Sequence, residues 1–346
     1  MARIVVAGAG AVGASIAYHL ALRGARGVVL ADRAEVASGA TGKAMGGVRQ
    51  QFSSAPEVRL AQASVRLFRE LGPPLFEQVG YLFLATTPAG LAELERRAEL
   101  QRSLGVRVGA ADAAAVPGLR TDDVLGAVVC REDGIADPTG VTREFVRRAA
   151  ERGVEVRERT DARNVAADVL VVACGARSPE VVPGLPIRPL VRQLVDVGPV
   201  PGVPDELPMI VEETGFHFRR VGGDRLRLAM GEPAPRWGDD ETVDETLVED
   251  WRARLAYRYP QAAGAPVVSA WAGLYDMTPD AHPIIGRAGD GVYVACGFSG
   301  HGFMQAPAVG EAVAQELLDG ESALDLSPYR LERFAGDATF PETMVL

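Results

Sequence analysis

The chain has 346 residues, of which 47% are hydrophobic and 24% are charged. This composition predicts a folded globular protein and excludes a mainly disordered one. Its 36 basic and 46 acidic residues give a formal net charge of −10. Nucleic acids and anionic membranes are bound through a basic face, so the charge argues against both as partners. From the length we expect one large domain or two interlocked ones.

Cysteine and lysine are both rare, and each gives a specific expectation. Cys130, Cys174 and Cys296 are widely spaced and odd in number, so they predict neither a disulfide framework nor a metal site. They are expected to be small buried side chains in the reducing cytoplasm. No run of eighteen apolar residues occurs, so we expect no membrane span. Lys43 is the only lysine, which leaves 35 of the 36 basic residues as arginines.

The first 32 residues predict a strand, a helix and a second strand. Residues 4–7 and 28–31 are short apolar runs, and residues 11–23 between them carry apolar side chains at helical spacing. Similar α/β segments follow later in the chain. We expect helices over 142–151 and 308–318 and strands over 154–156, 169–173 and 292–295.

Two stretches of different character interrupt these α/β segments. The first contains a predicted strand over 81–85 and a charged helix over 90–104. The second shows alternating strands, such as 190–197 and 226–230, separated by Pro and Gly. We therefore expect two discontinuous domains. A nucleotide-binding domain comprises 1–78, 141–183 and 271–346, and an antiparallel-sheet domain comprises 79–140 and 184–270.

A dinucleotide-binding motif follows the first predicted strand. Gly8, Gly10 and Gly13 match G-x-G-x-x-G and open the first helix, and Asp32 ends the second strand. The glycines permit a tight turn, close approach to a pyrophosphate and helix–strand packing, while the helix N-terminus attracts phosphate. Asp32 is placed to accept hydrogen bonds from ribose hydroxyls. This motif does not distinguish NAD from FAD.

Three further blocks resemble a known family. They are 38–52 (SGATGKAMGGVRQQF), 271–280 (WAGLYDMTPD) and 297–304 (GFSGHGFM). The set resembles the FAD-dependent D-amino-acid-oxidase superfamily, nearest to the sarcosine oxidases and the β subunits of archaeal-type L-proline dehydrogenases. This resemblance implies an α/β fold in which a Rossmann-like FAD-binding domain of the glutathione-reductase type is interleaved with an α+β antiparallel-sheet substrate domain.

The resemblance also implies where FAD is held. The adenosine would lie at Asp32, the 38–47 loop along the pyrophosphate and flavin, and the 297–304 turn at the pyrimidine end of the flavin. His301 would be a structural, flavin-shaping residue. The residues expected to contact FAD are Gly8, Gly10, Ala11, Val12, Gly13, Asp32, Arg33, Ser38, Thr41, Lys43, Ala44, Gly46, Gly47, Ala173, Gly175, Gly273, Gly297, Gly300, His301, Gly302, Phe303 and Met304.

Three residues are expected to serve the substrate. By resemblance Arg49 would bind the substrate carboxylate, and a guanidinium fork suits that task. Tyr275 matches an active-site tyrosine and would hydrogen-bond the same carboxylate. His217, in a Gly-Phe-His-Phe stretch, is a third candidate, and a purely structural role is about as plausible for it.

Departures from the family pattern sharpen the expectation. Gly273 replaces the cysteine, and Lys43 the histidine, through which some relatives attach flavin, so non-covalent FAD is implied. Met304 replaces a carboxylate-binding lysine of the sarcosine oxidases. Their oxygen-activating lysine has no counterpart near 226–232 either, which favours a dehydrogenase over an oxidase.

The leading hypothesis is oxidation of the C–N bond of a small amino acid, such as proline, sarcosine or glycine, by hydride transfer to FAD. The electron acceptor would be oxygen or a redox partner. Two alternatives stay open: an NAD-dependent dehydrogenase, and a non-catalytic dinucleotide-binding subunit of a heteromeric complex. The second alternative would require a partner subunit, and the sequence leaves open whether one exists.

Overall fold

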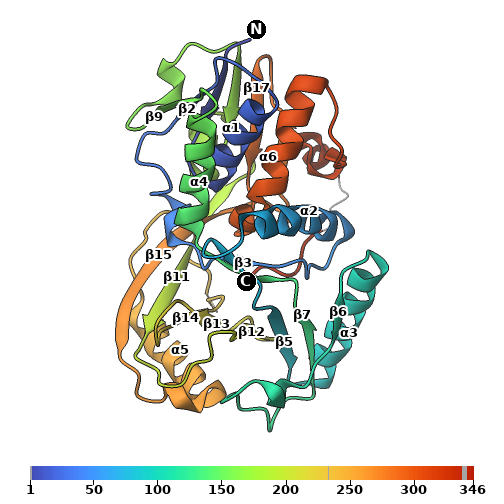
Figure 1. The fold of residues 1–346 in the computed structure, drawn as a ribbon, viewed down its shortest axis with the longest axis vertical. Coiled ribbons are helices and arrows are strands. Elements are labelled where there is room, and N and C mark those ends of the chain that lie inside the picture. The colour runs from blue at the N-terminus through green and yellow to red at the C-terminus, as the bar shows by residue number, and fades with distance from the viewer. Residues whose placement is uncertain (1, 233, 337–340) are drawn as a thin grey trace.

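The computed structural model describes residues 2–232, 234–336 and 341–346. It has an upper lobe that carries the N-terminus at its tip and a lower lobe, and the C-terminus lies between them (Figure 1). Each lobe is built on one large sheet. Segments far apart in sequence therefore meet where the lobes join.

The upper lobe contains a six-stranded sheet in the order β16-β17-β10-β1-β2-β9. Its strands pair in parallel except β16, which runs antiparallel to β17 at the edge. Apolar runs form the central strands because both faces of a parallel sheet are covered. The strands are Ile4–Ala7 (β1), Val29–Ala31 (β2), Glu155–Arg157 (β9), Val169–Val172 (β10), Ile284–Arg287 (β16) and Val292–Cys296 (β17).

Three helices pack beside this sheet: α1 (Ala11–Leu22), α4 (Pro138–Ala150) and α6 (Gly302–Asp319). Helix α1 contacts both α4 and α6, as Figure 1 also shows. A Cβ added at Gly310 would lie 2.1 Å from the Oγ of Ser15, so this glycine lets α6 approach α1 closely. The tight packing fixes the N-terminus of α1 relative to that of α6.

The lower lobe contains an eight-stranded sheet in the order β15-β11-β14-β13-β12-β5-β7-β6. All neighbours pair antiparallel except β12 and β5. The strands are Tyr81–Ala85 (β5), Val108–Ala110 (β6), Gly126–Cys130 (β7), Arg188–Val197 (β11), Met209–Glu212 (β12), His217–Arg220 (β13), Leu226–Ala229 (β14) and Val267–Met277 (β15).

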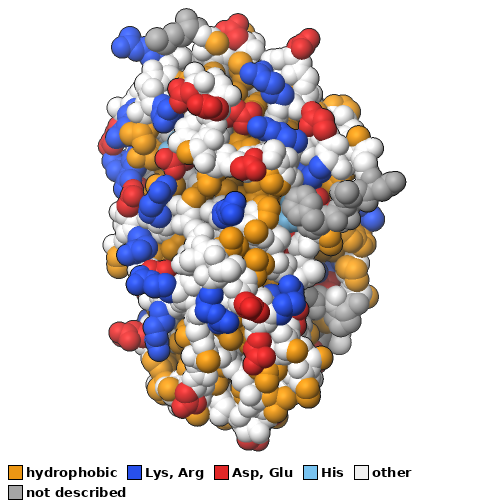
Figure 2. Space-filling view, turned by 90° about the vertical axis from the view of Figure 1, so that its right-hand side faces the viewer, with side chains coloured by type: hydrophobic (Ala, Val, Ile, Leu, Met, Phe, Trp, Pro, Cys, Tyr) orange, Lys and Arg blue, Asp and Glu red, His pale blue; other side chains and the backbone are white. Residues whose placement is uncertain are grey.

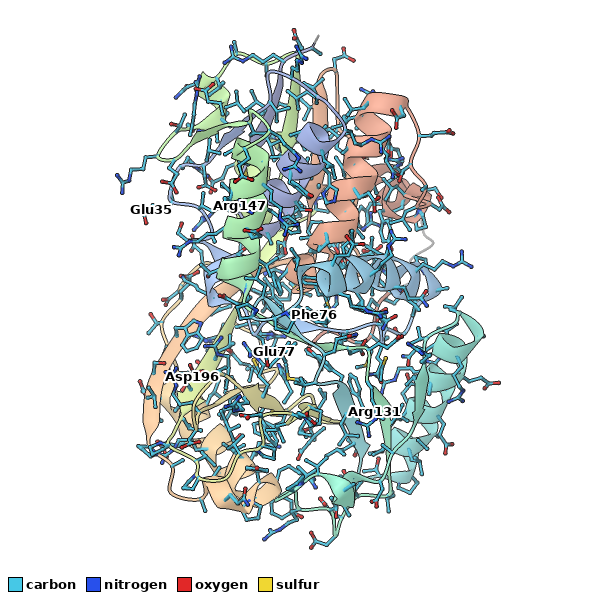
Figure 3. All side chains as sticks on the ribbon, in the orientation of Figure 1. Glu35, Phe76, Glu77, Arg131, Arg147 and Asp196 are labelled. Carbon is cyan, nitrogen blue, oxygen red and sulfur yellow. The ribbon has the colours of Figure 1, made fainter. Side chains whose placement is uncertain are left out.

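Helices α3 (Pro88–Ser103) and α5 (Glu245–Arg258) pack against this second sheet, and α2 (Ala55–Leu71) packs against α6. A small sheet in the order β3-β8-β4 comprises Gly47–Val48 (β3), Phe76–Glu77 (β4) and Gly134–Ala136 (β8). Figure 3 labels both residues of β4, which lie between the lobes. Short 3-10 helices occupy Ala40–Lys43, Ala113–Ala115, Ala162–Asn164, Gly175–Glu180, Pro260–Ala262, Ser327–Tyr329 and Leu331–Ala335.

The expected fold class is confirmed, with differences in individual elements. Helix α6 begins at Gly302 rather than near residue 308, because the glycine-rich turn leads directly into it. Helices α2 and α5 lie in segments for which no helix was predicted. Strand β15 runs unbroken across residue 271, where the sequence analysis drew a boundary. The domain ranges stay a proposal, and three of them, 1–78, 184–270 and 271–346, include residues outside the described part.

The surface carries both charges in mixture. On the face shown in Figure 2, Lys and Arg side chains mix with Asp and Glu in the upper half, and several Lys and Arg side chains follow one another along the left side below it. Inside the lower lobe, Arg227 pairs with Asp196 of β11 at 2.8 Å, and Figure 3 labels this aspartate. No helix of the described residues is long and apolar enough to span a bilayer. The same part of the chain contains no cluster of His, Cys, Asp and Glu that could hold a metal ion.

Candidate functional site

A cavity of about 420 Å³ is lined by residues of both large sheets and of the loops that join them. We call it the central cavity. Gly13 and Gly297 do not line it. The predicted residues that do are Gly8, Gly10, Ala11, Val12, Asp32, Arg33, Ser38, Thr41, Lys43, Ala44, Gly46, Gly47, Arg49, Ala173, Gly175, His217, Gly273, Tyr275, Gly300, His301, Gly302, Phe303 and Met304.

The turn from β1 into α1 has no room for side chains. Gly8 has a φ of +102°, and a Cβ there would lie 2.4 Å from the main-chain oxygen of Ala173. A Cβ on Gly13 would lie 1.8 Å from the oxygen of Gly8, so Gly13 permits the turn without touching the cavity. Helix α1 therefore begins at the cavity wall, where its free N–H groups and dipole suit a phosphate.

The carboxylate of Asp32 lies at the end of β2, beside the start of α1. One oxygen accepts the N–H of Ala9 at 2.6 Å and the other that of Ala34 at 2.7 Å. These bonds fix the carboxylate, and each oxygen retains a lone pair for a ligand. Asp32 thus presents a fixed carboxylate to the cavity that it lines.

Residues beyond the glycine motif line the same end of the cavity. Thr160, Asp161 and Arg163, in and before the 3-10 helix at 162–164, had no role in the sequence analysis. Arg33 pairs with Glu180 at 2.9 Å, which ties the end of β2 to the 3-10 helix that begins at Gly175. No motif marks these side chains, because they reach the cavity only through the folding of distant loops.

The loop around Lys43 is anchored to the second sheet. The Nζ of Lys43 donates to Glu241, and its main-chain oxygen accepts the indole N–H of Trp271 at 3.1 Å. A Cβ added at Gly273 would lie 3.1 Å from the Cβ of Lys43. The glycine at this position therefore gives the lysine stem its space. Lys43 is held by an ion pair within the cavity wall.

The 297–304 turn is shaped by an acid that the sequence analysis did not select. Asp276 accepts the N–H of Gly297 at 2.7 Å through its carboxylate, and its main-chain oxygen accepts the N–H of Ser299 at 3.2 Å. Burial raises the pKa of Asp276 to about 6, although main-chain N–H groups oppose the rise. Gly297 has a φ of +72°, and α6 begins at Gly302 with its N-terminus at the cavity. Such an N-terminus stabilises negative charge.

Arg49 follows β3, is 1% exposed and is bound by its own chain. Its Nη1 and Nη2 donate to the main-chain oxygens of Gln51 and Met344, both at 2.5 Å. The guanidinium carbon lies 4.0 Å from the ring centroid of Phe52. Burial lowers the pKa of Arg49, although nearby acidic groups such as Glu342 oppose the fall. The contacts hold one cationic fork rigidly in the cavity wall, with further N–H groups left over.

The 341–346 segment enters the site beside Arg49. The hydroxyl of Tyr275 donates to the main-chain oxygen of Leu346 at 2.7 Å, and Leu346 lines the cavity. The Nε2 of His301 lies 3.2 Å from the oxygen of Met344. Glu342 secures the segment by accepting the N–H of Ser53 at 3.0 Å. Nothing in the local sequence indicated this contact.

Both cavity histidines are neutral. Burial lowers the pKa of His217 to about 4, and the nearby charges of Arg49 and Arg192 lower it further. The Nδ1 of His217 lies 2.8 Å from the oxygen of Gly215. Burial and the charge of Arg49 lower the pKa of His301 to about 3. Neither ring is therefore suited to act as a general base near pH 7.

A buried acid positions the segment that carries Arg49. Asp133 is fully buried, and one of its oxygens accepts the N–H of Gln50 at 2.9 Å. The other accepts the Nε2 of Gln51 at 3.0 Å. Burial raises the pKa of Asp133 to about 6, and these hydrogen bonds oppose the rise. Asp133 is thus a positioning residue that the sequence analysis missed.

Arg192 is a second cavity arginine that the sequence analysis missed. It lies on β11, paired across the sheet with Gly273. Its guanidinium carbon lies 5.6 Å from the ring centroid of Tyr275. Its Nε and Nη1 are enclosed and have no hydrogen-bond partner. Its place in a predicted strand, between Val191 and Gln193, did not mark it as a cavity residue.

The cavity residues fit an extended dinucleotide. The side-chain-free turn at Gly8, the fixed carboxylate of Asp32 and the N-terminus of α1 suit a pyrophosphate and a ribose. At the other end, the N-terminus of α6 and the N–H groups near Gly300 suit a ring that gains negative charge on reduction. These two ends lie in one continuous cavity.

Comparison with known proteins agrees with this fit. Residues 3–343 match the profile of the DAO family, described as "FAD dependent oxidoreductase". FAD-dependent oxidoreductase domain-containing protein 1 of Bos taurus is 29% identical, over 96% of this chain and 84% of its own. A glycine oxidase of Geobacillus kaustophilus is 27% identical, over 96% of this chain and 97% of its own. The match favours FAD over the NAD alternative.

The solved structures include close matches to the whole fold. The L-proline dehydrogenase from P. horikoshii superposes with a TM-score of 0.89 and 29% identity, over 96% of this chain and 98% of its own. The resemblance inferred from the 38–52, 271–280 and 297–304 blocks is therefore confirmed.

Proposed function

Because this chain belongs to the DAO family of FAD-dependent oxidoreductases, we propose that it oxidises the C–N bond of a small amino acid to an imine. The observation that carries the proposal is the buried, fixed guanidinium of Arg49 in the same cavity as the α6 N-terminus and Tyr275. A cation of this kind suits a carboxylate. The glycine oxidase and L-proline dehydrogenase among its relatives are named for amino-acid substrates.

In this proposal the cofactor is held without a covalent bond. Gly273 offers no side chain, and the amine of Lys43 is engaged by Glu241. Asp32 and the α1 N-terminus would hold the adenosine and pyrophosphate, and the 297–304 turn the flavin. When bound, FAD supplies the chemistry by accepting a hydride.

The side chains of the cavity bind and orient the substrate. Arg49 binds the carboxylate through N–H groups not used by Gln51 and Met344, and the Tyr275 hydroxyl adds a hydrogen bond. The pKa of His217, about 4, makes its ring too weak a base to take the amine proton near pH 7, so the amine gives its proton to solvent before the hydride leaves. Positioning and electrostatics supply most of the rate increase.

The test is anaerobic addition of L-proline, sarcosine, glycine and D-amino acids to the purified holoprotein. Loss of the visible flavin absorption by at least one compound, with the matching imine or its hydrolysis product, is expected. If no amino acid bleaches the flavin, the proposal fails, and a dinucleotide-binding subunit of a larger complex becomes the better explanation.

For the electron acceptor we propose a dehydrogenase. The chain has no lysine besides Lys43, and Lys43 is bound in an ion pair with Glu241. No lysine is therefore available to activate oxygen. Reoxidation of the reduced protein by an artificial dye should be much faster than by dissolved oxygen. Reoxidation by oxygen at the rate of turnover would identify an oxidase instead.

A further inference from the structure

Arg192 differs from the other buried arginines in the partners of its guanidinium. Arg258 pairs with Asp123 and Glu212, Arg227 with Asp196, and Arg49 binds two main-chain oxygens. Within 2–232, 234–336 and 341–346, no arginine other than Arg192 has enclosed guanidinium nitrogens without a hydrogen-bond partner. An enclosed charge without partners is costly, so such a group indicates a ligand.

The strand register aims Arg192 into the cavity. Directly paired residues of antiparallel strands point to the same face, and Arg192 faces Gly273 while the neighbouring Leu190 faces Tyr275. Gly273 has no side chain, and the stem of Lys43 lies over it. A Cβ added at Gly231 would still lie 4.0 Å from the Nη2 of Arg192. Neither Gly231 nor Gly273 places a side chain of its own against the guanidinium, which lies in the cavity wall.

The acids of the cavity wall near the flavin turn are already engaged. Glu241 pairs with Lys43, and Asp276 accepts the N–H of Gly297. The charge of Arg192 acts instead on Tyr275 and His217. Burial raises the pKa of Tyr275, and the charges of Arg192 and Arg49 oppose that rise. Two cationic groups therefore act on the same tyrosine.

The two cations come from different elements and keep separate positions. Arg49 is tied to Gln51 and Met344, so it cannot swing towards Arg192 on β11. A guanidinium fork binds one carboxylate through two parallel hydrogen bonds. A substrate with one carboxylate leaves one of the two cations without a partner, and the neutral amine adds no compensating charge.

We propose that Arg192 binds a second carboxylate, so that the preferred substrate is a dicarboxylic amino acid. Arg49 and Tyr275 hold the carboxylate next to the oxidised carbon, and Arg192 holds the distant one. This inference rests on the proposed amino-acid oxidation and specifies its substrate class. Aspartate, glutamate and N-(carboxymethyl)glycine have the required charges.

Binding of non-oxidisable acids to the holoprotein tests the site without turnover. Propionate carries one carboxylate and succinate two, and both can be titrated by calorimetry and by perturbation of the flavin spectrum. We expect succinate to bind about ten- to hundredfold more tightly, since hydrogen bonds to a charged group contribute about 1.5–3 kcal/mol. Equal affinity of the two acids would overturn the proposal.

Variants of Arg192 assign that preference to one side chain. Arg192→Met should abolish the preference for succinate while leaving propionate binding within about twofold, and Arg192→Lys should keep part of it. Arg188→Met is the matched control, because Arg188 is exposed on the same strand and stacks on Trp237, 4.4 Å away. Flavin content and circular dichroism verify that each variant is folded. An equal loss for both acids in Arg192→Met, or no loss for either, would overturn the assignment.

Flavin reduction then separates this inference from the function on which it rests. We expect a dicarboxylic amino acid to reduce the wild-type flavin with a KM at least about tenfold below that of its monocarboxylic analogue. Reduction with equal KM values would contradict the proposed site for a second carboxylate and would still support the oxidation of amino acids. Succinate selectivity without any reduction would keep the anion site and reject the proposed function.

Discussion

The hydroxyl of Tyr275 donates a 2.7 Å hydrogen bond to the main-chain oxygen of Leu346. The chain thus presents an acceptor to the same hydroxyl that we propose for the substrate carboxylate. The main-chain oxygen of Met344 likewise accepts a hydrogen bond from Arg49, the residue proposed to bind the substrate carboxylate. The 341–346 segment therefore places main-chain oxygens where a carboxylate would bind, and the substrate must share or displace these contacts.

Tyr275→Phe removes the shared hydroxyl. We expect carboxylate binding to weaken by about 0.5–1.5 kcal/mol, the usual net value of one hydrogen bond. Titration of propionate into the holoprotein measures the change. Tyr259→Phe is the control, because the buried hydroxyl of Tyr259 has no hydrogen-bond partner among the described residues. Unchanged propionate binding in Tyr275→Phe would remove this hydroxyl from the carboxylate site.

Arg49→Met removes the fixed cation. Loss of one partner of a buried charge pair costs about 2–5 kcal/mol, so carboxylate affinity should fall by that amount. Arg49→Lys keeps the positive charge but loses the two-pronged guanidinium. Its affinity for the carboxylate should therefore lie between those of Arg49→Met and the wild type. Both variants also lose contacts to Gln51 and Met344, so the comparison requires protein with full flavin content. Wild-type affinity in Arg49→Met would exclude this residue from substrate binding.

Asp32→Ala should release the cofactor. The carboxylate holds the N–H groups of Ala9 and Ala34 and is proposed to bind a ribose. We expect the Kd for FAD to rise at least about tenfold, measured as the flavin-to-protein ratio after gel filtration. Glu155→Ala, on the neighbouring strand β9 and exposed, is the control. Full flavin content in Asp32→Ala would contradict the assignment.

The buried acid Asp133 should give stability a distinctive pH dependence. Its folded pKa of about 6 lies above the ordinary 3.8, so between these values the folded protein holds a proton that the unfolded chain has lost. Its contribution to the free energy of unfolding therefore falls as pH rises through this window, by about 3 kcal/mol in total. Above pH 6 that contribution is constant.

Asp133→Asn should abolish this contribution. Denaturant unfolding measures the free energy of unfolding at pH 4 and pH 7. Between these pH values, the free energy of unfolding of the variant should rise by about 2–3 kcal/mol relative to that of the wild type. Glu132→Gln provides a contrast of opposite sign, because the hydrogen bond from Arg107 lowers the pKa of Glu132. A pH-independent difference between Asp133→Asn and wild type would show that folding does not raise the pKa of this acid.

Cavity histidines should not control the reaction near neutral pH. With His217 at a pKa of about 4 and His301 at about 3, both rings stay neutral from pH 6 to 9. The pH profile of flavin reduction over this range should follow the ionisation of the substrate amine and shift when the amine is changed. His217→Gln should leave the position of the profile unchanged. A shift in that variant with one substrate would implicate His217 directly.

The parts of the fold that depend on local sequence were predictable. Gly8 and Gly13 were predictable because the turn between strand and helix has no room for side chains. Asp32 was predictable because it follows the second strand directly. The periodicity of 11–23 gave α1 to within one residue. Helix α5 lay among Pro- and Gly-rich strands, which hid its pattern.

Long-range contacts of the site were not predictable. Asp133 reaches Gln50 from 83 positions away, and Leu346 reaches Tyr275 from 71 positions away. No local pattern records such a meeting, since only the assembled sheets bring the residues together. For Arg192 the sequence gives the strand, but its missing partners become visible only in three dimensions.

The single lysine has a practical consequence. Lys43 is the only side-chain amine of the protein, and it lines the cavity that FAD is proposed to fill. A reagent that acylates amines therefore has one side-chain target, and its reaction rate reports how accessible the cofactor loop is. Mass spectrometry of the peptide that carries Lys43, from protein labelled with and without bound flavin, would report cofactor coverage as the presence or absence of one adduct.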